Sequence, residues 1–124
     1  MYRLEEFHDV NISGIKVNGN TDVMFFLEND KCLLNFYNVK HMKINNFMLG
    51  NIIFEINVYN NATDIKNINH ILCWLYDIEN TNLTAPWVVS IINKISNNSL
   101  ILVELIESYG AYGAIICETY TINI

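Results

Sequence analysis

Six histidine and cysteine side chains, which are common metal ligands, lie scattered along the chain, and their spacing decides whether a metal site is expected. They are His8, Cys32, His41, His70, Cys73 and Cys117. No two histidines have the i, i+4 spacing of a helical zinc site, and no Cys-x-x-Cys pair occurs. A strand pairing could still bring a histidine near Cys73 or Glu79. The spacing itself predicts no metal and no cofactor.

Nucleophilic catalysis needs an activated thiol or hydroxyl, and the sequence offers neither in a suitable setting. Each cysteine lies inside an apolar run, whereas a reactive thiolate needs an electropositive, partly exposed setting. Ser108 lacks the flanking glycines that a nucleophile elbow requires. We therefore predict buried, reduced cysteines, with a disulfide between two of them as the lesser alternative.

Carboxylate pairs are the remaining candidates for catalysis. Glu104 and Glu107 are three residues apart, so a strand would place them on opposite faces. Asp77 and Glu79 would share a face, but acid–base catalysis of the glycosidase kind needs two carboxylates opposed across a cleft. The simpler interpretation is a solvated acidic patch, and we expect no enzyme activity.

Composition and charge restrict the class of protein further. Apolar residues make up 52% of the chain and charged residues 16%, which excludes a disordered chain and predicts a single domain over residues 1–124. The net charge of −6 disfavours nucleic-acid binding and favours a cationic protein partner, although it would equally keep a small apolar protein soluble. No basic segment followed by an apolar one opens the chain, and no run approaches the length of a membrane helix. We expect neither a signal peptide nor a membrane span.

Alternation of apolar and polar residues with period two dominates the elements that must position these side chains. It predicts strands at 10–18, 22–30, 31–39, 46–60, 100–107 and 114–122, and an edge strand at 40–44. Gly14 indicates a bulge in the first strand, and the Asn-Gly-Asn run at 18–20 is typical of a type I′ hairpin. The aromatic pairs at 25–26 and 36–37 must each divide between the two faces of a strand.

Two segments have helical features. In HILCWLYDIEN (70–80) the apolar residues fit either a helix stripe or a strand face, and the bulky aromatics favour a strand. Residues 84–97 predict a helix, with Thr84 as its N-cap and Pro86 in its first turn. Its predicted buried face contains Trp87, Val88, Ile91, Ile92 and Ile95. Together the elements predict a mainly β (α+β) fold, an antiparallel β-sandwich or open barrel with one short helix near 84–97.

Several stretches together resemble a known bacterial pattern. They are LEEFHDVNISGIKV, DVMFFLEND, KCLLNFYNVKHMKI, GNIIFEI and the closing ESYGAYGAIICETYTI. In this order they are similar to immunity proteins of polymorphic-toxin and contact-dependent growth inhibition systems. The resemblance implies a cytoplasmic protein, a monomer or weak dimer, that neutralises a cognate toxin domain. Such a toxin is often a basic nuclease, and an acidic inhibitor could occlude its active site or bind at a remote surface.

On this interpretation the predicted toxin contacts are carboxylates of turns and edges, with two tyrosines as anchors. They are Asp22, Glu28, Asp30, Asp77, Glu79, Glu107, Tyr109 and Tyr112. The opening Phe7, His8 and Asp9 are predicted to be structural: Phe7 as a core anchor, and His8-Asp9 as a hydrogen-bonding pair at the entry to the first strand. A structural or assembly domain of a phage or secretion apparatus is the alternative function.

Overall fold

The structure is a computed structural model that describes residues 9–28, 31–46, 52–60, 65–107 and 112–123. Its elements are β1 Val10–Asn18, β2 Asp22–Leu27, β3 Cys32–Tyr37, β4 His41–Asn45, β5 Ile52–Tyr59, α1 Ile65–Tyr76, the 3-10 helix η3 Asn80–Thr84, α2 Pro86–Ser96, β6 Ile101–Glu107, β7 Tyr112–Cys117 and β8 Thr119–Asn123. The predicted mainly β, α+β class is confirmed. The prediction of a single helix is wrong, because α1 and η3 precede α2.

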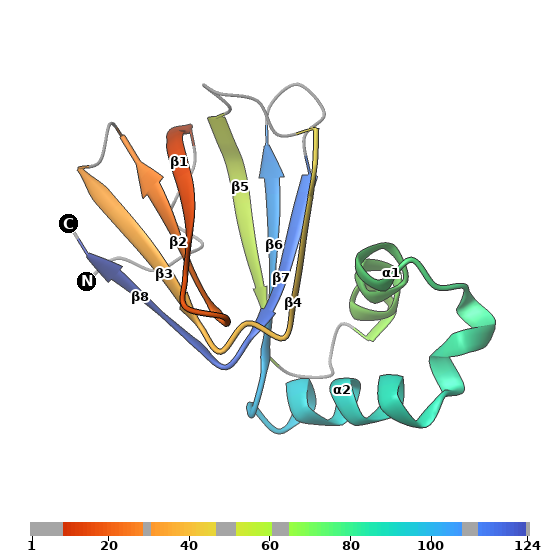
Figure 1. The fold of residues 1–124 in the computed structure, drawn as a ribbon. Coiled ribbons are helices and arrows are strands. Elements are labelled where there is room, and N and C mark those ends of the chain that lie inside the picture. Colours follow the sequence, from red (N-terminus) through yellow and green to blue (C-terminus); the bar gives the residue numbers. More distant parts are fainter. Residues whose placement is uncertain (1–8, 29–30, 47–51, 61–64, 108–111, 124) are drawn as a thin grey trace.

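The strands pair in the order β4-β7-β6-β5-β1-β2-β3-β8, and every pairing is antiparallel. Among the described residues β1 pairs with β5 only at Val10 and Asn11, whereas it pairs with β2 along most of its length. The order therefore divides into sheet A (β4, β7, β6 and β5) and sheet B (β1, β2, β3 and β8). Figure 1 shows the two sheets converging where β3 leads into β4 and β7 into β8, and diverging toward the other end. Among the described residues no pairing joins β4 to β8, so the sheets form an open sandwich.

Two neighbouring chain segments turn the corner between the sheets together. Asn38, with φ 52°, separates β3 from β4, and Glu118 separates β7 from β8. The Glu118 amide donates to the Tyr37 carbonyl at 3.1 Å, and the Lys40 amide donates to the Ile116 carbonyl at 2.7 Å. The prediction of one uninterrupted strand over 114–122 is wrong for this reason: the strand bends at Glu118 and enters the other sheet.

The inter-sheet core follows from the alternation in each strand. Its buried members are Ile12, Val23, Phe25, Leu27, Cys32, Leu34, Phe36, Ile56, Val103, Leu105, Ile115 and Cys117. Phe25 and Phe36 lie at its centre with ring centroids 5.6 Å apart and ring planes at 79°. Their neighbours Phe26 and Tyr37 are only partly buried, so each aromatic pair divides between the faces as predicted.

A second core lies on the other face of sheet A, under the helices. Its buried members are Ile68, Ile71, Leu72, Leu75, Val88, Ile95, Leu100, Leu102, Ala114 and Ile116. The molecule thus has three layers, namely sheet B, sheet A and the helices, with α1 lying against the sheet and α2 extending outward along one end (Figure 1). None of the described helices is long and apolar enough to cross a membrane.

The strand predicted over residues 70–80 is wrong, because Ile65–Tyr76 forms helix α1. Ile68 and Leu72 recur at helical spacing with Ile71 and Leu75, and all four side chains are buried in the second core. Period 3.6 therefore prevails over the strand preference of the aromatic residues, because a helix buries this whole stripe on one side.

The predicted helix near 84–97 is confirmed as α2, but its start differs from the prediction. Ala85 is the N-cap residue and has no capping side chain, while Pro86 occupies the first turn as expected. Thr84 instead ends η3, where its hydroxyl donates to the Thr81 carbonyl at 3.5 Å. Thr84 is therefore not the cap of α2.

The first hairpin shows which turn details the sequence specifies. The β1–β2 register shifts between Ile12 and Gly14, which confirms the predicted bulge. Asn18 pairs with Asp22, so three residues form the connection, and Gly19 alone among them has a positive φ, of 62°. The type I′ prediction is wrong, because that turn joins the strands through two residues that both have positive φ.

Candidate functional site

Strand pairing in sheet A gathers polar side chains around Glu104 on the face that carries the helices. In β6, Glu104 lies opposite Asn57 of β5 and Ala114 of β7. Glu104 Oε1 accepts hydrogen bonds from Asn57 Nδ2 at 2.9 Å and from the Tyr59 hydroxyl at 3.2 Å. Oε2 accepts from the Tyr112 hydroxyl at 2.5 Å. We call these four residues the Glu104 cluster; three donors compensate the desolvation of one half-buried carboxylate.

Tyr112 connects the Glu104 cluster to helix α1. Its ring meets the ring of Trp74 edge-on, with centroids 4.5 Å apart and planes at 81°. Burial raises the pKa of Tyr112 far above its ordinary value, and the hydrogen bond to Glu104 adds to the effect. Tyr112 was predicted to anchor a toxin, but in the structure its hydroxyl is committed to Glu104.

Two side chains of β4 hold the C-terminal end of α1. Lys43 Nζ donates to the Trp74 carbonyl at 3.0 Å and lies 4.4 Å from the Trp74 ring centroid. His41 Nε2 lies 3.1 Å from the Leu75 carbonyl, and because a carbonyl can only accept, Nε2 must carry the hydrogen. The last turn of α1 contains no basic residue of its own. The sheet therefore supplies the positive charge that a helix C-terminus favours.

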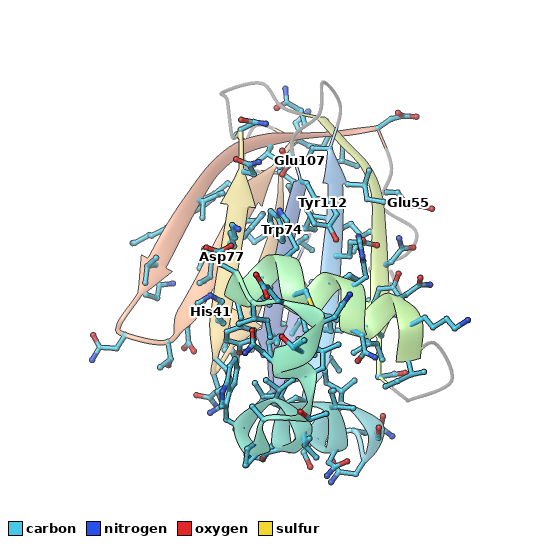
Figure 2. All side chains as sticks on the ribbon, turned by 90° about the vertical axis from the view of Figure 1, so that its right-hand side faces the viewer. His41, Glu55, Trp74, Asp77, Glu107 and Tyr112 are labelled. Carbon is cyan, nitrogen blue, oxygen red and sulfur yellow. The ribbon has the colours of Figure 1, made fainter. Side chains whose placement is uncertain are left out.

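A row of three rings, which we call the aromatic step, leads from the sheet edge to α2. The ring of His41 stacks on Tyr76 at 4.4 Å with planes at 18°, and Tyr76 meets Trp87 edge-on at 5.2 Å. Burial raises the pKa of Tyr76. Trp87 remains 46% exposed, so its predicted place on the buried face of α2 is wrong. Figure 2 shows His41, Trp74 and Asp77 at the same end of α1.

The structure places the predicted contact carboxylates in different regions rather than on one surface. Asp22 lies where the sheets converge, and its Oδ1 accepts from the Asn38 amide at 3.0 Å and the Thr21 hydroxyl at 3.4 Å. Glu28 is exposed in the turn after β2, at the opposite end of that strand. Asp22 therefore stabilises the corner between the sheets, and Glu28 is remote from it.

Asp77 and Glu79 are both exposed between α1 and η3, as the predicted acidic patch requires. Asp77 has φ 54° directly after α1, and the Glu79 amide donates to Asn82 Oδ1 at the start of η3. Glu107 is only 4% exposed, so its carboxylate does not lie on an accessible surface. It lies on the same face of β6 as Val103 and Leu105, which is the inter-sheet face, and Glu104 lies on the opposite face.

Four other residues of the predicted site, namely Asp30, Tyr109, Phe7 and His8, lie outside the described residues. Asp9 is described: it has a φ of 56° and forms a bend directly before β1. The structural roles of Phe7 and His8 stay predictions.

Cys32 and Cys117 have the buried settings that the apolar runs indicate, Cys73 is only partly buried, and all three thiols are free. Burial, aided by the charge of Glu118, raises the pKa of Cys117 to about 12. Burial and then the charge of Glu28 raise the pKa of Cys32. A thiol with a raised pKa is a poor nucleophile at neutral pH. Within the described residues no three His, Cys, Asp or Glu side chains form a metal-binding group.

The fold and these side chains define a small, mainly β protein with a helical layer over one sheet. No family model, no curated protein and no solved structure matches the chain. The function must therefore be inferred from the surface of this structure.

Proposed function

We propose that this chain is an immunity protein, which binds a cognate basic toxin domain, of nuclease type, in the cytoplasm of the cell that makes both. The toxin would be neutralised by occlusion of its active site. One observation carries the proposal: Glu28, Asp77 and Glu79 remain exposed on a chain with an excess of acidic residues. The net charge of −6 is the overall expression of this imbalance.

Two of the lysines have defined partners within the chain. Lys40 Nζ lies 3.7 Å from Glu118, and Lys43 Nζ is occupied by the carbonyl and ring of Trp74. Glu28, Asp77 and Glu79 are exposed. A nuclease must present cations to a polyanion, so exposed carboxylates can occupy positions that phosphates would take. The same charge accelerates the encounter of the two proteins at low ionic strength.

The proposal is tested by co-expression with the toxin domain encoded in the neighbouring reading frame. Cells that produce this domain together with the intact chain should grow, whereas cells with an empty vector should die. The purified pair should associate more slowly as salt rises from about 0.05 to 0.5 M, because screening weakens the attraction between exposed charges. Death of the cells that produce both proteins would reject the proposal.

An assembly domain is the second candidate, and the edge strand β8 favours it. Among the described residues β8 pairs only with β3, and its sequence Thr-Tyr-Thr-Ile-Asn carries no charge. Uncharged edge strands are suited to pairing with another chain. Analytical ultracentrifugation at increasing concentration distinguishes the candidates, since an assembly domain should form oligomers and an immunity protein should remain a monomer or weak dimer.

A further inference from the structure

Trp87 is the most conspicuous side chain that the fold leaves partly outside. It opens α2 directly after Pro86, and 46% of its surface is exposed. The edge-on contact with Tyr76, at 5.2 Å, holds one side of the ring, and Tyr76 is itself stacked on His41. A tryptophan whose ring is held in place loses little conformational entropy when a partner covers it.

Two carboxylates lie in the segment that connects α1 to the helix of this ring. Asp77 follows Tyr76 in the chain and Glu79 opens η3, which returns the chain to Trp87. Both side chains are exposed, and among the described residues neither forms an ion pair, although the Glu79 side chain also accepts from the Asn82 amide at the start of η3. The exposed ring and the two negative charges therefore occupy the same short section of the helical layer, between the end of α1 and the start of α2.

Four other described acidic side chains lack this combination. Asp22 is only partly exposed and accepts from the Asn38 amide at the corner between the sheets, Glu118 lies beside Lys40, and Glu107 is buried. Glu28 is exposed, but none of the described exposed apolar side chains lies in its turn. Val89, the other exposed apolar residue of α2, is two positions beyond Trp87 and so faces a different side of the helix.

We infer that the toxin-binding surface is the face formed by Tyr76, Asp77, Glu79 and Trp87, and that it takes a basic protein surface whose arginine or lysine side chains lie on the Trp87 ring. This inference rests on the proposed function and specifies its contact. A guanidinium or ammonium over an indole is attracted by the ring electrons, and the two carboxylates add charge complementarity. Tryptophan is among the residues that most often dominate the binding energy of an interface.

The experiment measures binding kinetics of the intact chain with the toxin domain that it neutralises in co-expression. Trp87→Ala should weaken the affinity about 30-fold, mainly through faster dissociation. The pair Asp77→Asn and Glu79→Gln should slow association about tenfold at low salt and reduce the dependence of the rate on salt. Two matched controls, Val89→Ala on the same helix and Glu55→Gln on the exposed side of β5, should each change affinity less than about twofold.

The outcomes separate the inference from the proposed function. If the intact chain binds and protects, but the Trp87 and double-charge variants bind as tightly as it does, the inferred face is wrong and the function stands. If the intact chain neither binds nor protects, both are wrong. Urea denaturation of each variant shows whether it is folded, and the double-charge variant, which changes only exposed side chains, decides the result if Trp87→Ala is unstable.

Discussion

On one face of sheet A, Val103, Leu105 and Ile115 pack against the apolar side chains of sheet B. On the other face, Leu102 and Ile116 pack against the helices, but Glu104 and its three donors lie among them. The first face is held mainly by apolar packing, with Glu107 buried at one end of β6. The second also depends on hydrogen bonds of defined direction, which fix where a helix can lie on the sheet.

This difference implies different functions for the two layers. Apolar packing tolerates small shifts of one sheet against the other, whereas hydrogen bonds from Lys43 and His41 to the last carbonyls of α1 specify one position of that helix. Tyr76 is the last residue of α1, and its ring meets Trp87 at the start of α2. The polar layer is therefore the one that positions the inferred binding face.

The largest expected effect comes from the inter-sheet core. Phe36→Ala removes a fully buried ring that contacts Phe25 and leaves a cavity, so we expect the free energy of unfolding to fall by about 3–5 kcal/mol. Urea denaturation at pH 7 measures it. Phe26→Ala is the control, since the partly buried Phe26 lies on the other side of sheet B and should cost clearly less. Equal losses would contradict the assignment of this core.

A smaller loss is expected when the Glu104 cluster is broken. Glu104→Ala leaves the hydroxyls of Tyr59 and Tyr112 and the Asn57 amide without their acceptor, at a cost of about 1–3 kcal/mol. Thermal unfolding, followed by circular dichroism, compares this variant with Glu55→Ala. Glu55 is exposed on the same face of sheet A and should be nearly neutral. A neutral Glu104→Ala would show that water satisfies these donors equally well.

Alkaline pH should destabilise both layers, and the loss should begin at a lower pH in the inter-sheet core than beside the helices. Burial raises the pKa of Cys117 to about 12 in the inter-sheet core and raises that of Tyr112 beside the helices. Because the unfolded chain deprotonates first, stability is complete below the unfolded pKa and falls as pH rises above it, from about 9 for a thiol and about 10 for a tyrosine. For Cys117 the loss at pH 10 is about 1 kcal/mol.

Urea midpoints between pH 7 and 11, under reducing conditions, measure this loss. Cys117→Ala should reduce the slope of stability with pH above about pH 9, and Tyr112→Phe above about pH 10. The slope is the relevant quantity, because either substitution also changes stability at pH 7. Slopes identical to that of the unchanged chain would show that neither group is protected from deprotonation.

The helical layer is also where sequence and structure differ most. Alternation predicts most of the strands, because Ile56, Val58 and their neighbours place every second side chain in a core, but it does not predict the bend at Glu118. The helix α1 was missed because its first apolar residues, Ile65 and Ile68, lie in a segment rich in asparagine. Extending the stripe of Leu72 and Leu75 back through these two residues would have revealed it.

The Glu104 cluster could not be predicted in the same way. Its members come from β5, β6 and β7, and a carboxylate meets its donors only when the register of all three strands is known. The exposure of Trp87 likewise depends on how α2 leaves η3, since helical spacing alone places it beside Val88 and Ile91. Local patterns specify the elements, and the contacts between them depend on register and packing.

The smallest expected effect is also the most local. Lys43→Met removes the donor to the Trp74 carbonyl and the charge over its ring, so the last turn of α1 should open more often, at a cost of about 1 kcal/mol. Hydrogen exchange should show roughly fivefold faster exchange of the amides in that turn, with little change in the inter-sheet core. Lys66→Met is the matched control, because Lys66 is exposed in the first turn of the same helix. If both variants exchange alike, the end of α1 is held by its apolar contacts, and the sheet does not set the position of Tyr76 through Lys43.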